Sequence, residues 1–176
     1  MEKGYLQVYT GDGKGKTTAA LGLGLRAVGC GLKVIMFQFL KGAPSSELDS
    51  VPLLGGTFRI FRLAESDKFF RELNDAEKEA LRVRLRKELA RVREVMQKRS
   101  CDLLILDEIM AIVNNGLLTV EEVCSLVDAR PQEMEMVLTG RSAPQVLIER
   151  ADLVTEMICV KHYLKRGVEA RRGIEK

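Results

Sequence analysis

The side chains best suited to chemistry lie in residues 9–18, which read Y-T-G-D-G-K-G-K-T-T. Glycines in such a run let the backbone adopt positive φ and direct successive N–H groups toward an anion. Lys16 can place its ammonium against the outer phosphates of a nucleotide, and Thr17 can offer its hydroxyl to a bound Mg²⁺. The run therefore predicts a triphosphate-binding loop. The residues expected to hold the nucleotide there are Thr10, Gly11, Asp12, Gly13, Lys14, Gly15, Lys16, Thr17 and Thr18.

The segments on either side of this loop support the interpretation. Residues 5–9 alternate as a short strand does, and residues 19–28 have the small and apolar side chains of a buried helix. The chain departs from the pattern G-x-x-x-x-G-K-[ST] at one position, because Thr10 stands where the first glycine would fall. Gly11 and Gly13 supply the backbone freedom that this glycine would give. The alternative is a flexible turn before a helix, but strand, glycine loop and helix together favour a phosphate site.

A second informative run is residues 101–108, in which four apolar residues lead to Asp107 and Glu108. A buried parallel strand of this kind delivers its last side chains to the sheet edge where ligands bind. We expect the acids to hold Mg²⁺ (or Mn²⁺) opposite Thr17, with either acid able to contact the ion directly. The alternative is that they cap the helix that follows. Lys16, Thr17 and Glu108 are expected to carry the catalysis.

Two further cations follow predicted strands. Lys41 comes after residues 33–40, a nearly continuous apolar run, and could reach a phosphate or a carboxylate; a solvated loop lysine is the favoured interpretation. Arg141 follows Gly140 at the end of a strand over residues 134–139. At that position its guanidinium could contact a phosphate.

The rest of the chain predicts alternating strands and helices. Residues 58–63 alternate as a strand, and the longest helix begins at the capping box of Asn74 and ends at Ser100. Further helices are expected from Thr119 to about residue 129 and from Ser142 to residue 150, with a helical turn at 109–113 and a last strand at 153–160. The fold class is therefore α/β, P-loop NTPase-like, with a mainly parallel sheet covered by helices on both faces. Residues 1–176 form one domain.

Composition excludes several other classes of protein. The chain has 176 residues, 46% of them hydrophobic and 30% charged, which is globular, and its net charge of +3 gives no case for nucleic acid. No apolar run reaches membrane-spanning length and no signal peptide is visible, so we expect a cytoplasmic protein. The single histidine, His162, is expected at the surface. The four cysteines lack metal-ligand spacing and are expected to be reduced core residues: Cys30, Cys101, Cys124 and Cys159.

Several motifs together resemble one family. These are Y-T-G-D-G-K-G-K-T-T-A-A, L-R-A-V-G, F-Q-F-L-K-G, L-I-L-D-E-I, N-N-G-L-L, D-A-R-P, T-G-R, A-D-L-V-T-E, V-K-H and G-V-E-A-R-R-G-I. In this order, over residues 4–42 and 102–176, they resemble the P-loop type of ATP:cob(I)alamin (corrinoid) adenosyltransferase.

The resemblance implies a reaction and its partners. Cobalt(I) of a reduced corrinoid would attack C5′ of ATP, which is bound in reversed orientation on the loop, and expel tripolyphosphate. It also implies Mg²⁺, a homodimer and a flavoprotein reductase, with Arg26 toward the ribose or base and Arg141 at the phosphates. The family's F-T-W aromatic pair, which meets the corrinoid, has no counterpart because the chain lacks tryptophan. Phe69 or Phe70 could replace it; an adjacent aromatic pair is otherwise usually core.

Two other functions fit the loop and the acidic pair. An ordinary P-loop ATPase or kinase would transfer the γ-phosphate to water or to an acceptor. A regulatory module would bind ATP without turnover. Neither accounts for the motifs outside the loop.

Overall fold

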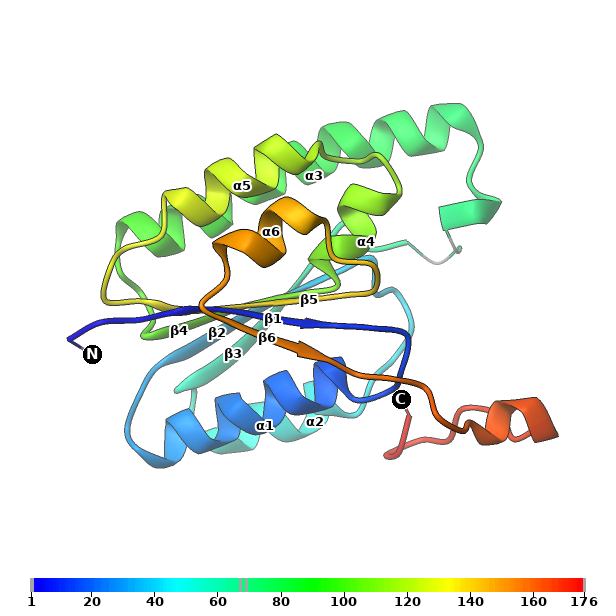
Figure 1. The fold of residues 1–176 in the computed structure, drawn as a ribbon, viewed down its shortest axis with the longest axis horizontal. Coiled ribbons are helices and arrows are strands. Elements are labelled where there is room, and N and C mark those ends of the chain that lie inside the picture. Colours follow the sequence, from blue (N-terminus) through cyan, green and yellow to red (C-terminus); the bar gives the residue numbers. More distant parts are fainter. Residues whose placement is uncertain (1, 67, 69, 176) are drawn as a thin grey trace.

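The computed structural model describes residues 2–66, 68 and 70–175, and in that part of the chain six parallel strands form one sheet (Figure 1). The strand order is β3-β2-β4-β5-β1-β6, and every neighbouring pair runs in the same direction. The parallel α/β class predicted from the sequence is confirmed. The strands are β1 (Leu6–Thr10), β2 (Val34–Phe39), β3 (Phe58–Leu63), β4 (Leu103–Asp107), β5 (Glu135–Thr139) and β6 (Leu153–Glu156).

Helices cover both faces of the sheet, as predicted (Figure 1). On one face lie α3 (Asp75–Gln97), α4 (Ile109–Asn114), α5 (Val120–Asp128) and α6 (Gln145–Arg150); on the other lie α1 (Lys16–Gly29) and α2 (Glu47–Ser50). Each face has its own apolar core, the larger one under α3–α6 and the smaller one between the sheet and α1. Short 3₁₀ turns occupy Val51–Leu54, Phe70–Glu72 and Tyr163–Arg166.

Local sequence explains the best-formed elements. All six residues of β2 are buried, since both faces of the sheet are covered. Helix α3 opens with the expected capping box, in which Asn74 accepts from the Glu77 N–H and Glu77 accepts from the Asn74 N–H. Helix α5 opens with the same box at Thr119 and Glu122. The strand predicted at 58–63 and the longest helix are thus confirmed, although α3 ends at Gln97 instead of Ser100.

Two predicted boundaries were wrong. Helix α6 begins at Gln145 with Pro144 as N-cap, not at Ser142, because the residue before a proline avoids helical backbone. Strand β6 ends at Glu156 and does not reach residue 160. After Glu156 the backbone leaves the sheet edge: the Met157 N–H donates to Thr10 O at 2.9 Å, and Met157 O accepts from the Gly13 N–H at 2.7 Å.

The cysteine prediction was half right. Cys101 and Cys124 are buried, whereas Cys30 and Cys159 are exposed, and all four are free thiols. Burial raises the pKa of the Cys101 thiol to about 12, so this side chain stays protonated at neutral pH. Over the described residues, no helix is both long enough and apolar enough to cross a membrane.

Gly24 of α1 is buried against the ring of Phe58 in β3, which leads to a stability prediction. A Cβ at this position would lie 2.5 Å from Cε1 of Phe58, a ring that is only 2% exposed and has no room to turn. Gly24→Ala should therefore lower the free energy of unfolding by about 1–3 kcal/mol despite its better helix propensity. Gly22→Ala, on the same helix with nothing within 4 Å, is the control and should raise it by about 1 kcal/mol in urea titrations. Equal effects of the two changes would contradict this account.

Candidate phosphate and metal site

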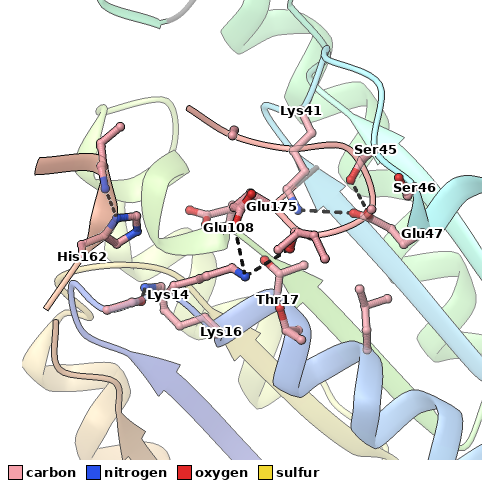
Figure 2. A pocket seen from close by; sticks show the side chains of 18 of the residues that line it. Lys14, Lys16, Thr17, Lys41, Ser45, Ser46, Glu47, Glu108, His162 and Glu175 are labelled. Atoms are coloured by element: carbon pink, nitrogen blue, oxygen red, sulfur yellow. Dashed lines mark hydrogen bonds and ion pairs between the residues drawn. The ribbon is translucent and has the colours of Figure 1, made fainter. Parts of the chain in front are cut away.

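A cavity of about 730 Å³ lies at the carboxyl edge of the sheet, where β1, β4 and β5 end (Figure 2). Nine of the residues expected from the sequence line it, from the glycine loop, the acidic pair and the end of β5. These are Asp12, Gly13, Lys14, Gly15, Lys16, Thr17, Thr18, Glu108 and Arg141. The fold thus brings together at this edge residues as far apart in the chain as Asp12 and Arg141.

The glycines of the loop are required for two different reasons. Gly11 and Gly15 have φ of 92° and 124°, a region that side chains with a Cβ rarely adopt. Gly13 does not have positive φ, but a Cβ there would lie 2.7 Å from Met157 O and 2.8 Å from the Ile158 carbonyl carbon. The chain segment after β6 therefore packs directly on the loop, a contact that the sequence did not reveal.

Lys16 is held inside the loop. Its Nζ donates to Gly11 O at 2.6 Å and to Gly13 O at 2.8 Å, and the residue is 6% exposed. Burial lowers the pKa of the Lys16 ammonium, an effect that neighbouring carboxylates, Glu108 foremost, oppose. Because the loop carbonyls hold the ammonium in place, it is positioned for an anion before any ligand binds.

Asp107, at the end of β4, is fully buried behind the cavity wall. Its carboxylate binds residues from α1, from β5 and from the loop after β2. Its Oδ1 accepts from Thr17 Oγ1 at 2.9 Å and from Thr139 Oγ1 at 2.7 Å. Its Oδ2 accepts from Lys41 Nζ at 2.7 Å. The pairing of Thr17 with the acid at the end of β4 is the arrangement expected from the sequence. The preference for Lys41 as a solvated loop lysine was wrong, because the buried carboxylate holds it, with Glu47 at 3.8 Å on the other side.

Glu108 faces the cavity from a left-handed backbone conformation, with φ of 63°. The Glu108 N–H donates to Thr139 Oγ1 at 2.9 Å, which stabilises this turn. Burial, and next the charge of Asp107, raise the pKa of the Glu108 carboxyl. A non-glycine residue at positive φ is uncommon outside turns and functional sites. The backbone thus aims Glu108 into the cavity while Asp107 stays behind it.

The donor atoms at this edge fit a hard divalent cation. A threonine hydroxyl and carboxylate oxygens are the ligands that Mg²⁺ prefers, with waters and phosphate oxygens completing its shell. Within the described residues no group of three or more His, Cys, Asp and Glu side chains could hold a metal alone. Mg²⁺ at Thr17 and the acidic pair stays a prediction from the sequence.

Because the pKa of the Glu108 carboxyl is raised, its ionised form should lower the free energy of unfolding when no cation is bound. A carboxyl whose folded-state pKa exceeds its unfolded value binds protons more tightly in the folded state, so stability falls as pH rises through that folded pKa. Without divalent cations, Glu108→Gln should raise Tm at pH 7, and the gain should shrink as pH falls through the folded-state pKa and vanish below the ordinary pKa of a carboxyl.

The control for this prediction is Glu121→Gln. The pKa of the Glu121 carboxyl is lowered by hydrogen bonds at the N-terminus of α5, so this change should act in the opposite direction. Thermal melts with EDTA, repeated across pH, measure both. A lower Tm for Glu108→Gln at pH 7 would contradict the assignment of a destabilising charge.

Besides Asp107, three residues expected at the site lie outside the lining. Thr10 is buried at the end of β1, where its Oγ1 accepts from the Ala143 N–H at 3.2 Å. Gly11, in the loop itself, packs against Met157 of the segment after β6, where a Cβ would lie 2.4 Å from Met157 O. Arg26, expected toward the ribose or base, lies exposed in the last turn of α1, about 15 Å along the helix axis from Lys16. The structure does not bring Arg26 to the cavity.

Sequence reasoning missed the contribution of the C-terminal segment to this cavity. His162, expected at the surface, lines the cavity, and its Nδ1 accepts from the Leu164 N–H at 3.1 Å (Figure 2). The motifs V-K-H and G-V-E-A-R-R-G-I were the available signal, because their glycines and apolar residues have no strand or helix periodicity to explain them. The lining residues from this segment are His162, Tyr163, Leu164, Val168, Ala170, Gly173, Ile174 and Glu175.

A second cavity of about 470 Å³ adjoins the first. It has apolar walls from Leu40, Phe70 and Leu81, among others, and three residues line both cavities: Lys41, Ser45 and Glu175. Phe70 lines this cavity and also packs against the larger apolar core, so its role as a wall for a flat ligand stays a prediction. Phe69, the other residue considered, lies outside the described residues.

Comparisons with known proteins agree with these features. The family ATP:corrinoid adenosyltransferase BtuR/CobO/CobP matches residues 2–175. The corrinoid adenosyltransferases of Pseudomonas aeruginosa and Escherichia coli K12 are each 35% identical to this chain; the alignments cover 99% of the chain and 84% and 86% of those proteins. The flagellar accessory protein FlaH from Methanocaldococcus jannaschii has a similar fold, with a TM-score of 0.60 at 14% identity over 89% of this chain and 72% of FlaH.

Proposed function

Because the chain belongs to the ATP:corrinoid adenosyltransferase family BtuR/CobO/CobP, we propose that it transfers the 5′-deoxyadenosyl group of ATP to cobalt(I) of a reduced corrinoid and releases tripolyphosphate. Family members are transferases, and ATP and a corrinoid are the substrates that the family name implies. The transfer to cobalt(I) and the release of intact tripolyphosphate are what we propose for this chain.

One observation carries the proposal within this chain: a triphosphate-type cavity and an apolar cavity meet at shared residues. A loop with a buried lysine suits the phosphates of ATP. An adjoining chamber walled by Leu40 and Phe70, with polar residues among its lining, suits part of a flat ring with an apolar face and a polar periphery. A reaction between ATP and such a partner would take place where the cavities join, beside Lys41 and Glu175. An ATPase whose acceptor is water has no need of the second chamber.

The proposed step balances without proton transfer. Cobalt(I) donates an electron pair to C5′ and a Co–C bond forms, taking cobalt from +1 to +3. The C5′–O bond breaks, and its electron pair leaves on the α-phosphate oxygen. Cobalt(I) is a strong nucleophile and no proton leaves C5′, so no general base is needed. A chain whose single histidine, His162, is engaged with a backbone N–H is compatible with such chemistry.

The loop would supply most of the catalytic stabilisation. Negative charge grows on the triphosphate as the bond breaks, and donors that already point at this charge lower the barrier without reorganising. Lys16, the helix N-terminus at Lys16–Thr18 and Arg141 are the groups available for this. Thr17 and Glu108 would hold Mg²⁺, with Asp107 fixing the threonine hydroxyl; the ion would neutralise charge on the phosphates.

The deciding experiment is an anaerobic incubation with chemically reduced cobalamin and Mg-ATP. We expect the cobalt(I) absorption to disappear while light-sensitive adenosylcobalamin and intact tripolyphosphate accumulate in equal amounts. Unchanged corrinoid with release of ADP would refute the proposal and favour an ATPase or kinase. ATP binding without any product would favour the regulatory module.

The resemblance extends the proposal to the working assembly. From the resemblance to this family we propose a cytoplasmic homodimer, which receives a corrinoid whose cobalt has been reduced by a separate flavoprotein. Light scattering measures the mass of the particle. A value of 19.7 kDa, the mass of one chain, would contradict the dimer.

A further inference from the structure

Lys41 lies where the two cavities meet. Within the described part of the chain, three residues line both cavities: Lys41, Ser45 and Glu175. The Glu175 carboxylate is paired with Arg171, which donates to it through Nε at 3.2 Å and NH2 at 2.9 Å. Lys41 is the cation among the three, so it is the residue that can offer positive charge at the junction.

The backbone after β2 directs Lys41 toward the neighbouring strand. Leu40 has φ of 57°, in the left-handed region that side chains with a Cβ rarely adopt, and its N–H donates to Leu63 O at 3.2 Å. The turn brings Lys41 Nζ to 2.7 Å from Asp107 Oδ2 at the end of β4. Strained conformations of this kind persist where the surrounding structure holds them, often at functional sites.

Two carboxylates hold the Lys41 ammonium. Besides Asp107, Glu47 Oε1 lies 3.8 Å from Lys41 Nζ (Figure 2). Glu47 is itself fixed, since it accepts from Gln38 Nε2 at 2.9 Å and from Ser45 Oγ. Burial alone would raise the pKa of the Glu47 carboxyl, but the hydrogen bonds from Ser45 and Gln38 outweigh it and lower that pKa. Both partners of the ammonium are therefore anchored in place.

The Lys41 ammonium still has donors for a ligand. An ammonium carries three N–H groups, and among the described residues Lys41 Nζ donates one hydrogen bond, to Asp107. Glu47, at 3.8 Å, is beyond hydrogen-bonding distance. The Lys41 side chain is 26% exposed and lines the cavity, so its remaining N–H groups are accessible to a bound molecule.

The proposed reaction determines which phosphate would meet Lys41. C5′ of ATP has to face cobalt, and the corrinoid would reach it from the second cavity. The phosphate bonded to C5′ would then lie at the junction beside Lys41, while the outer phosphates lie on the loop with Lys16. As the C5′–O bond breaks, its electron pair stays on the oxygen of this α-phosphate. The charge therefore develops nearer to Lys41 than to Lys16.

We propose that Lys41 is a catalytic residue that donates a hydrogen bond to the α-phosphate and stabilises the charge on its leaving oxygen. A donor that is fixed beforehand lowers the barrier because it does not reorganise as the charge develops. Lys41 keeps its proton throughout, so the step stays balanced without a base. This role rests on the proposed function, since it takes C5′–O to be the bond that breaks.

Calorimetric titration with two probes, Mg-ATP and Mg-tripolyphosphate, tests this contact. The leaving oxygen is esterified in ATP, whereas in tripolyphosphate it carries the charge that develops in the transition state. Lys41→Gln removes the positive charge but keeps an N–H donor for Asp107. It should weaken tripolyphosphate binding at least about tenfold more than ATP binding, and should slow adenosyl transfer at saturating Mg-ATP by about 100-fold.

Two further variants support this reading of the charge. Lys41→Met, a second neutral change of similar length, should show the same selective loss of tripolyphosphate affinity. Lys41→Arg, which keeps the charge, should lose less of it. The matched control is Lys98→Gln, since Lys98 is paired with Glu94 at 2.6 Å and lines neither cavity. The control should bind both probes and turn over as the original chain does.

Unchanged affinity for both probes in the two neutral variants would overturn the proposal. Equal weakening of the two probes would also overturn it, because Lys41 would then act only by holding Asp107 or by binding phosphates that both probes share. The titrations need no corrinoid. A selective loss of tripolyphosphate affinity, in a chain that transfers no adenosyl group, would therefore support the contact and refute the proposed function alone.

Discussion

Lys16→Ala should lower the rate of adenosyl transfer by about 10²–10³-fold and leave the protein folded. Lys16 is 6% exposed and its ammonium is held by two loop carbonyls, so in the proposed mechanism it would meet the triphosphate at a fixed place. Removing one such pre-aligned group from a developing oxyanion typically costs about 2.7–4 kcal/mol in the transition state. Because the burial of the Lys16 ammonium lowers its pKa, the charge is not a source of stability, and Tm should change little.

The measurement is single-turnover formation of adenosylcobalamin at saturating Mg-ATP, with Tm recorded for the same preparations. Lys33→Ala is the matched control, since Lys33 is exposed just before β2, at the opposite edge of the sheet from the cavity. We expect the control to turn over normally. Full activity in Lys16→Ala would remove the central residue of the proposed mechanism.

Asp107→Asn should lower activity by about 100-fold or more and also destabilise the chain. The carboxylate is fully buried, and its two oxygens accept from Thr17, Thr139 and Lys41. An amide has only one acceptor oxygen, so its NH₂ group would face one of these donors. Hydrogen bonds to charged groups are worth about 1.5–3 kcal/mol, and we expect a loss of about 2 kcal/mol in the free energy of unfolding. The activity falls further because Thr17 loses the partner that orients its hydroxyl toward Mg²⁺.

Mg²⁺ dependence separates the two effects of this change. We expect the half-saturating Mg²⁺ concentration for turnover to rise at least tenfold in Asp107→Asn, a shift that instability alone would not produce. Asp102→Asn is the control: Asp102 lies at the opposite end of β4, where it accepts from the Lys33 N–H at 2.8 Å. This variant should lose stability without any change in Mg²⁺ dependence. An unchanged Mg²⁺ requirement in Asp107→Asn would show that the buried acid does not support the metal site.

Much of the site could be predicted because it follows rules that relate sequence to sheet edges. A glycine loop after a strand places Lys16 and Thr17 at a helix N-terminus, and a buried strand ending in two acids delivers them to the same edge. Thr17 Oγ1 accordingly lies 2.9 Å from Asp107 Oδ1, although 90 positions separate the two residues in the chain. Asn74 and Thr119 were found as helix starts for a similar reason, since a capping box is complete within four residues.

The predictions that failed depended on contacts for which no local pattern exists. Lys41 reads as an ordinary loop lysine until the fold buries Asp107 beside it. Helix α6 starts later than expected because Pro144 restricts Ala143, a local effect that outweighed the capping signal at Ser142. Arg26 was assigned to the nucleoside by resemblance alone, and the length of α1 keeps it from the cavity.

The sequence by itself determined the fold class, the triphosphate loop and the acidic pair opposite it. These depend on residue types at short, regular spacings, where backbone geometry leaves few alternatives. Only the tertiary structure decided what faces the loop. The C-terminal segment, residues 157–175, has no periodicity to predict its path, and its position depends on hydrogen bonds such as Lys14 Nζ to Ile174 O, between residues 160 positions apart. Contacts of that kind form only after the sheet has brought the end of β6 beside β1, which is why the C-terminal wall of the cavity became visible only in the folded chain.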